Sequence, residues 1–292
     1  MANLKSIRKR IVSVKNTQKI TKAMKMVAAA RLRRAQQAIT ELRPYAVKTH
    51  EVLSSVASRA GDEEIHPLLA RREVKKVLLV VLSSDRGLAG AFNANINKTA
   101  FRQWKELEAE GKHVEFAVIG RKGRDFFRRR DARIAFDFTN VFEALNVAKA
   151  GEIGRAIVAE YKLDGFDQVL VIYNEFKSAI SQRVVTESLV PIAVTEGAGT
   201  GGGDASVDFI YEPTKRALLD NLLPMYVEIE IFRALLESVA SEHGARMTAM
   251  DNATKNASEM IGRLTLVYNR ARQAAITTEL MEIIGGAEAL KG

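Results

Sequence analysis

The sequence predicts a mixed α/β protein. A long antiparallel coiled coil, formed by the N- and C-terminal helices, is expected to carry an inserted Rossmann-like α/β domain with a parallel sheet. Three observations predict this fold: a heptad pattern of apolar residues over 218–281, a shorter heptad pattern over 7–42, and alternating strand-like and helix-like segments over 74–195. Sustained heptads are typical of coiled coils, and strands that alternate with helices are typical of parallel sheets.

The C-terminal pattern keeps alternating spacings of four and three residues over nineteen positions, sixteen of them apolar. A 3.5-residue repeat sustained this long indicates a coiled-coil seam rather than an ordinary surface helix. At about 1.5 Å per residue, the segment would reach roughly 95 Å, far more than a compact domain needs. The positions are Leu218, Leu222, Met225, Ile229, Phe232, Leu236, Val239, His243, Arg246, Met250, Ala253, Ala257, Met260, Leu264, Val267, Ala271, Ala274, Thr278 and Met281.

The N-terminal segment repeats this spacing and supplies the second helix of the coil. Eight of its eleven heptad positions are apolar, and in the middle the stripe moves to a neighbouring face through Ile20, Met24 and Val27. Two terminal helices of one chain pair in antiparallel fashion when the segment between them returns the chain on itself. The heptad positions are Ile7, Ile11, Val14, Gln18, Thr21, Lys25, Ala28, Leu32, Ala35, Ile39 and Leu42.

Prolines and glycines predict where the long helices kink and end. The first helix is expected over residues 4–59, with a kink at Pro44, because proline lacks the backbone N–H that a helix uses. The last helix is expected to begin near Pro213, which suits a first helical turn, and to kink or restart at Pro224. The glycine pair at 285–286 is expected to end it.

Between these helices, short apolar runs alternate with amphipathic segments. A continuous apolar run such as residues 77–82 is typical of a strand buried on both faces of a sheet. The alternation indicates βαβ units and a mostly parallel sheet. Strands are expected at 77–82, 113–119, 132–138 and 169–176, a further strand or hairpin arm at 180–192, and helices at 93–110, 121–130 and 140–162.

These patterns divide the chain into four expected parts. Residues 197–203 contain five glycines, which predicts a flexible loop, and residues 209–211 suit a short strand. The parts are an N-terminal coiled-coil helix (1–60), the α/β domain (74–195), the glycine-rich loop with its short strand (196–212) and a C-terminal coiled-coil helix (213–292).

Composition excludes several kinds of site. The 292 residues include no cysteine, which excludes disulfides and thiolate chemistry, and the four histidines show no metal-ligand spacing. No apolar run reaches the roughly 18 residues that a bilayer-spanning helix needs. We therefore predict no catalytic residue, no cofactor site and no metal site.

The net charge of +9 is unevenly distributed. Residues 1–40 contain eleven Lys or Arg and no Asp or Glu. A solvated helix normally mixes both signs, so this face is expected to meet an acidic surface. An acidic protein is favoured over nucleic acid because aromatic residues are not interleaved with the cations. A mitochondrial transit peptide has a similar composition, but here the heptad pattern continues without a cleavage-like break.

The segment at residues 83–90 lies after the first strand and before a helix, where α/β folds hold phosphate-binding loops. It has two glycines three residues apart but neither the GxGxxG nor the Walker pattern. The favoured interpretation is a tight turn in which Asp85 or Asn93 binds backbone groups.

Polar residues interrupt both apolar seams. His243 and Arg246 lie one turn apart in the long C-terminal pattern. The first helix carries a polar patch of five residues: Thr17, Gln18, Thr21, Lys22 and Lys25. Polar seam residues control register in coiled coils, and they also suit a place where a third partner meets the shaft. Both interpretations stay open from the sequence.

Five motifs carry a resemblance to a known family. They are IRxxI at 7–11, NTQKITKAMxMVA at 16–28, DRGL at 85–88, SExxARMxAM at 241–250 and YNxARQAxITxEL at 268–280. Together they closely resemble the gamma subunit of F-type ATP synthase, and the match extends over essentially the whole chain.

The resemblance implies a central rotor shaft without catalytic residues or cofactors. In that family the coiled coil stands inside a ring of three alpha and three beta subunits, and the α/β part sits on the epsilon subunit and the membrane c-ring. Ion-driven rotation turns the shaft, which moves each beta subunit through states that bind, form and release ATP. The resemblance further implies a peripheral protein on the cytoplasmic face of the bacterial cell membrane, touching the membrane only through the c-ring and binding no nucleic acid.

The resemblance also implies partner contacts at particular positions. Met24, Lys25 and Arg246 are expected where the shaft meets an acidic lever of beta. Four polar residues are expected to meet loops higher in the ring, two aromatic residues to lie at the foot near the c-ring, and the apolar tip to turn in a sleeve. The four polar residues are Arg272, Gln273, Thr277 and Glu279, and the two aromatic residues are Phe209 and Tyr211. The tip contains Met281, Ile283, Ile284 and Leu290.

Some features depart from the family pattern. The family's loop often reads Gly-Leu-Cys-Gly, whereas residues 87–90 read Gly-Leu-Ala-Gly. The cysteine-bearing insertion of chloroplast members is also absent, so thiol control is not expected. The start at Met1 directly on the helix favours a bacterial protein.

Two other functions fit parts of the pattern. A nucleic-acid-associated coiled-coil protein with a globular head would account for the basic rod, and it predicts salt-sensitive DNA binding. An α/β enzyme with a helical arm would account for residues 74–195, and it predicts a small-molecule affinity there.

Overall fold

The computed structural model describes residues 4–58, 66–163, 165–193 and 215–289. The chain forms two compact units. The first unit comprises residues 1–28 and 247–292, and the second comprises residues 29–246. Two long helices, α1 (Leu4–Ser58) and α5 (Lys215–Ala289), contribute to both units.

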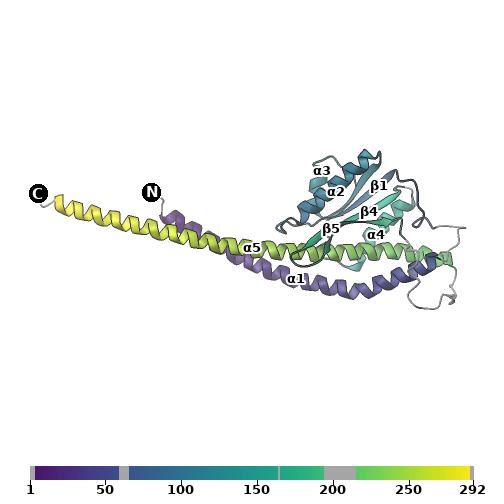
Figure 1. The fold of residues 1–292 in the computed structure, drawn as a ribbon, viewed down its shortest axis with the longest axis horizontal. Coiled ribbons are helices and arrows are strands. Elements are labelled where there is room, and N and C mark those ends of the chain that lie inside the picture. Colours follow the sequence, from purple (N-terminus) through teal and green to yellow (C-terminus); the bar gives the residue numbers. More distant parts are fainter. Residues whose placement is uncertain (1–3, 59–65, 164, 194–214, 290–292) are drawn as a thin grey trace. The chain divides into compact units, whose positions relative to one another are not determined.

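The first unit is an antiparallel pair of helices (Figure 1). Thr21 and Thr254 share a hydrogen bond of 2.8 Å between their Oγ1 atoms. One turn away, Lys25 Nζ forms an ion pair with Asp251 Oδ1 at 2.6 Å. Residue numbers rise along α1 in the direction in which they fall along α5. The antiparallel coiled coil predicted from the heptads is therefore confirmed.

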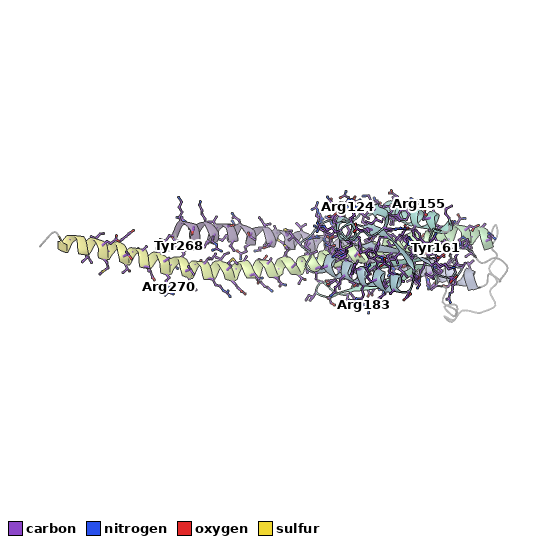
Figure 2. The ribbon with its side chains drawn as sticks, turned by 90° about the horizontal axis from the view of Figure 1, so that it is seen from above. Arg124, Arg155, Tyr161, Arg183, Tyr268 and Arg270 are labelled. Carbon is purple, nitrogen blue, oxygen red and sulfur yellow. The ribbon has the colours of Figure 1, made fainter. Side chains whose placement is uncertain are left out.

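The covered seam departs from the strict heptad pattern along α5. Met260 and Val267, which the pattern placed in the seam, are 50% and 51% exposed. Ile261, Leu264 and Tyr268 are less exposed (Tyr268 is labelled in Figure 2). A straight α-helix has 3.6 residues per turn, so a 3.5-residue pattern drifts by about 20° per heptad. The prediction is wrong at Met260 and Val267 because the facing position moves by one residue.

The C-terminal end of α5 extends beyond the start of α1. The two polar pairs fix a register that places Leu4 opposite about residue 271. Every side chain described between residues 276 and 287 is exposed. This end of the helix therefore lacks the partner that covers the rest of the pair.

Both long helices run through residues at which a kink, a restart or an end was expected. α1 continues through Pro44, and α5 continues through Pro224 rather than restarting there. The glycine pair at 285–286 also lies inside α5, so the prediction that it ends the helix is wrong. Glycine weakens a helix by about 1 kcal/mol, but it ends one only when it adopts the left-handed conformation. Pro213 and the glycine-rich loop with its short strand lie outside the described residues.

Within its described residues, the second unit contains a five-stranded sheet in the order β3-β2-β1-β4-β5. The first four strands are parallel, and β5 pairs with β4 in antiparallel fashion as a hairpin arm. The predicted parallel sheet is thus confirmed, with one antiparallel strand at its edge. The strands are β1 (Lys76–Leu82), β2 (His113–Ile119), β3 (Ile134–Phe138), β4 (Gln168–Phe176) and β5 (Gln182–Val190).

Helices cover both faces of this sheet. α2 (Phe92–Ala109) and α3 (Arg121–Arg128) lie on one face, and α4 (Val147–Lys162) lies on the other with the first part of α5 (Figure 1). Right-handed crossovers produce this arrangement, because the chain moves outward through β2 and β3 and then returns past β1 to β4.

α4 begins later than the sequence predicts. The expected helix started at residue 140, but Asn140 has a φ of +59°, which a right-handed helix does not allow. Val141 and Phe142 are buried in the turn that follows, so their apolar character resembled a helical face. The helix begins after Asn146, whose side chain accepts a hydrogen bond of 2.8 Å from Lys149 N as an N-cap.

Gly154 on α4 gives the first test of this packing. A Cβ there would lie 2.9 Å from Glu228 Cγ and 3.1 Å from Glu228 Cα on α5. Gly154→Ala should therefore lower the free energy of unfolding by about 1–3 kcal/mol, because backbone must move. Gly262→Ala is the matched control, since nothing lies within 4 Å of its Cβ position. That exposed helical site should gain about 1 kcal/mol. Urea unfolding followed by circular dichroism measures both, and equal effects would contradict this packing.

Candidate functional site

The carboxyl end of the sheet is the place where an open α/β fold normally binds a ligand. Such sites lie at the topological switch point, where the strand order reverses. Here β1 has β2 on one side and β4 on the other, so the switch point lies between β1 and β4. The loop after β1, residues 83–90, and the turn after β4 both lie at this end.

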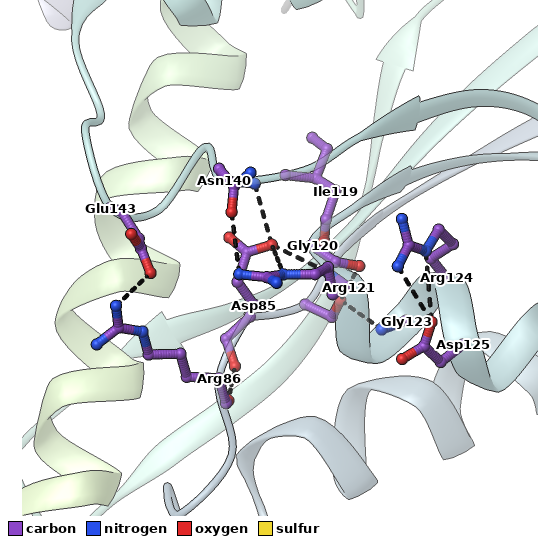
Figure 3. A network of polar contacts seen from close by, with 12 residues as sticks. Asp85, Arg86, Ile119, Gly120, Arg121, Gly123, Arg124, Asp125, Asn140 and Glu143 are labelled. Atoms are coloured by element: carbon purple, nitrogen blue, oxygen red, sulfur yellow. Dashed lines mark hydrogen bonds and ion pairs between the residues drawn. The ribbon is translucent and has the colours of Figure 1, made fainter.

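The loop after β1 is held by its own polar groups. Asp85 Oδ1 accepts hydrogen bonds from Arg121 N at 3.1 Å and Asn140 N at 3.0 Å, and so ties together the segments that follow three strands (Figure 3). Asn93 Oδ1 accepts a hydrogen bond of 3.0 Å from Ser84 N. Both residues that the sequence offered for this role bind backbone groups, so the tight-turn interpretation is confirmed.

Glycine is required where β2 ends against this loop. Gly120 has a φ of +96°, and a Cβ there would lie 2.2 Å from Ser83 O. Ser83 Oγ donates to Ile119 O at 2.9 Å and accepts from Gly123 N at 2.8 Å (Figure 3). The loop, the end of β2 and the start of α3 are therefore packed backbone against backbone.

Arg246 points into this loop from α5. Its Nη2 donates to Gly87 O at 3.1 Å and to Glu242 Oε1 at 2.6 Å, with side-chain exposures of 12% for Arg246 and 6% for Glu242. Arg246 Nη1 also lies 3.3 Å from His243 Nδ1. The two polar residues that interrupt the α5 seam thus contact each other, and Arg246 contacts the chain's own loop.

α5 occupies the switch point. Glu237, Ser238 and Ser241 bind the backbone at the carboxyl end of β4, and Arg246 reaches the loop after β1. The position that a ligand takes in related folds is filled by this helix. The sequence analysis did not predict a role for Glu237, Ser238 or Ser241. The two serines within a strongly apolar stretch of α5 were a signal that it could have used. Among the described residues, no cluster of His, Asp and Glu side chains could hold a metal ion.

In the first unit, Met24 and Lys25 lie on α1. Met24 is half-buried, and Lys25 remains 43% exposed beside its partner Asp251. Hydrogen bonds from Lys25 and Lys255 hold the pKa of the Asp251 carboxyl below its usual range. Asp251 was not predicted as a site residue, and it is the carboxylate that pairs with Lys25.

The remaining predicted contact residues lie on the uncovered end of α5 or outside the described part. Arg272, Gln273, Thr277 and Glu279 are all exposed there. Their apolar neighbours Met281, Ile283 and Ile284 are 62%, 70% and 52% exposed. Phe209, Tyr211 and Leu290 lie outside the described residues.

Comparison with known proteins identifies the family. A family model described as ATP synthase matches residues 3–290. ATP synthase gamma chains of Sorangium cellulosum, Geobacter sp. (strain M21) and Anaeromyxobacter sp. (strain Fw109-5) are 53%, 54% and 54% identical, each match covering 100% of both chains. The chain belongs to the ATP synthase gamma chain family.

Solved structures agree with this assignment. The central stalk and c-ring structure of Tetrahymena thermophila mitochondrial ATP synthase matches with a TM-score of 0.60 and 28% identity, over 80% of this chain and 99% of that one. A Euglena gracilis mitochondrial ATP synthase structure shares the fold with a TM-score of 0.67 and 20% identity, over 98% and 94%. As a gamma chain, the protein is the non-catalytic stalk subunit, the central rotor shaft that couples rotation to ATP synthesis and hydrolysis.

His243 gives the gamma chain a pH-dependent stability. Burial, with the charges of Arg246 and Arg31, lowers the pKa of His243 to about 4. In the unfolded chain the pKa is near 6.5, so between these values the unfolded state binds more protons and stability decreases as pH falls. The loss should be about 3 kcal/mol between pH 7 and pH 4.

His243→Gln should flatten this part of the profile, as measured by urea unfolding at a series of pH values. The matched control is His50→Gln, on a half-buried histidine of α1. An unchanged pH dependence in His243→Gln would contradict the neutral, buried state of this residue.

Proposed function

We propose that this gamma chain couples c-ring rotation to catalysis on beta through three contact regions. The tip of α5 turns in an apolar sleeve at the top of a ring of three alpha and three beta subunits. The α1–α5 pair meets the acidic levers of beta, and the foot binds the epsilon subunit and the c-ring. The proposal combines the family assignment with the exposed surfaces of each unit.

The uncovered end of α5 is the observation that carries the proposal. From residue 276 to 287 all described side chains are exposed, and apolar residues at spacings of four, three and one form one face: Ile276, Leu280, Ile283 and Ile284. An apolar helical face of this length left in water would favour association, because burial of apolar surface is stabilising. A surrounding apolar sleeve accounts for it.

The basic side of α1 supports contact with an acidic lever. The first 40 residues carry no Asp or Glu, and Arg8, Lys9, Lys15, Lys19 and Lys22 are all exposed. Met24 and Lys25 lie on the same helix, and the family resemblance adds Arg246. Contacts of this kind depend on ionic strength, because exposed charges are screened by salt.

At the foot, the proposed contacts of Phe209 and Tyr211 with the c-ring rest on the family resemblance. The same resemblance, together with the bacterial relatives, supports a peripheral location on the cytoplasmic face of the cell membrane. No helix in the described part of the chain has the length and apolar character needed to cross a bilayer. In the proposal, the only membrane contact is through the c-ring.

Co-assembly with the cognate alpha and beta subunits tests this function. The expected product contains three alpha, three beta and one gamma chain, and its ATPase activity depends on the gamma chain. A chain that stays alone, or that purifies with nucleic acid in a salt-sensitive way, would overturn the proposal. Binding of a small-molecule substrate to residues 74–195 would do the same.

Removing the tip of α5 should lower the torque without preventing assembly of the complex. Deleting residues 282–292 removes part of the apolar face but leaves the α1–α5 pair, which in the proposal is gripped along its length. The truncated chain should still form the complex and generate less torque, as measured by single-molecule rotation against a viscous load. Complete loss of the assembled complex would contradict the idea that the tip adds only part of the contact.

Replacing Gln273 and replacing Arg246 should have different effects on stability. Gln273 lies on the exposed end of α5, so Gln273→Ala should lower ATP synthesis coupled to ion flow without changing thermal stability. Arg246→Ala should lower both, by about 1–3 kcal/mol in stability, because Glu242 and Gly87 lose a buried partner. Circular dichroism melts and synthesis assays in membrane vesicles measure the two effects. A destabilised Gln273→Ala variant would contradict this distinction.

A further inference from the structure

The carboxyl end of β4 bonds to α5 in place of a neighbouring strand. The pairing of β1 with β4 ends at Val81 and Ile172, and β4 continues to Phe176. On its other edge, β4 stays paired with β5 to the end of the hairpin. The backbone groups on the β1 side of the last residues of β4 therefore need other partners, because buried N–H and C=O groups are almost always hydrogen-bonded.

Side chains of α5 supply these partners. Asn174 N donates to Ser238 Oγ at 3.3 Å, and Asn174 O accepts from Ser241 Oγ at 2.9 Å. Two residues further along the strand, Phe176 N donates to Glu237 Oε2 at 2.9 Å. Backbone groups two residues apart point to the same side of a strand, so the three bonds form one ladder. Ser238 and Ser241 are fully buried, so water does not compete for the two serine bonds.

Gly244 brings the helix close to the turn that follows β4. A Cβ at this position would lie 3.3 Å from both Cα and O of Ala179 and 3.4 Å from the Phe176 ring. Gly244 is buried. One turn beyond the last serine, α5 thus also rests on backbone.

These contacts restrain the helix in a way that apolar packing does not. Apolar burial is non-directional, so it resists separation of two elements more than it resists sliding or turning of one against the other. A hydrogen bond weakens steeply when its distance and angle change. Three such bonds on a single strand, two of them made by fully buried serines, fix both the rotation of α5 about its axis and its position along β4.

We propose that Glu237, Ser238 and Ser241 are positioning residues for torque transfer. They hold α5 in a fixed orientation on the sheet, so that torque entering through the α/β part reaches the shaft without slip. The inference rests on the proposed function, in which the c-ring drives this part of the chain. The strand contributes only backbone atoms to these three bonds. This junction between α5 and β4 therefore does not depend on the identity of the strand's side chains.

The double variant Ser238→Ala/Ser241→Ala tests this junction in the assembled complex of three alpha, three beta and one gamma chain. The chain has no cysteine, so Arg102→Cys on the exposed side of α2 gives a single attachment point for a bead. With the ring immobilised and the enzyme paused with bound ADP, the angular variance of the bead reports torsional stiffness. The variance should increase roughly twofold, because two of the three hydrogen bonds from α5 to the β4 backbone are lost.

Two controls separate positioning from general stability. Ser54→Ala removes a buried serine hydroxyl of α1 that has no hydrogen-bond partner in the described structure, so it should leave the variance unchanged. Ile96→Val weakens the core on the opposite face of the sheet, where Ile96 is fully buried, and it should lower the melting temperature without changing the variance.

The possible outcomes distinguish this inference from the proposed function. A wild-type complex that assembles and rotates, with a double variant of unchanged variance, would overturn the junction alone. An Ile96→Val variant as compliant as the double variant would also overturn it, since lost stability would then account for both. Failure of the wild-type chain to assemble with alpha and beta would overturn the proposed function instead. A larger variance in the double variant only, at normal assembly, is the result we expect.

Discussion

Pairing between the two ends of the chain is the constraint on which the rest of this structure depends. Apolar and small seam residues would allow the helices of the first unit to slide by a heptad at little cost. The Thr21–Thr254 bond and the Lys25–Asp251 ion pair oppose such a shift, because each polar group would lose its partner. With the register fixed, α5 extends beyond the start of α1, and the chain between the two helices must form an insertion.

The α/β unit fills the usual ligand position of its fold with part of the chain itself. The switch point that holds a ligand in related folds is filled by α5, and the loop after β1 satisfies its own backbone through Asp85 and Asn93. Arg246 then joins that loop to the helix. This loop bonds to protein groups at the place where phosphate-binding α/β folds bond to phosphate.

Elements whose pattern follows from burial alone could be predicted from the sequence. β1 is buried on both faces, so its continuous apolar run identified it to within one residue. The start of α4 could not be read this way, because Phe142 is buried in a turn and imitates a helical face. The heptad pattern placed Met260 in the seam wrongly, because the pattern alone does not show whether the helix has 3.5 or 3.6 residues per turn. The bonds of Ser238 and Ser241 to β4 were not predictable, since they depend on where that strand loses its neighbour.

Disulfide trapping tests the central claim most directly: the chain's two ends form one shaft in a single register. The chain has no cysteine, so Thr21→Cys/Thr254→Cys introduces only the desired pair, whose parent hydroxyls lie 2.8 Å apart. In the assembled complex it should form the disulfide under mild oxidation and retain ATPase activity, because both helices turn together. Thr21→Cys/Ile261→Cys, shifted by one heptad, should stay reduced. Equal trapping of both pairs, or loss of activity on locking the first pair, would contradict the account.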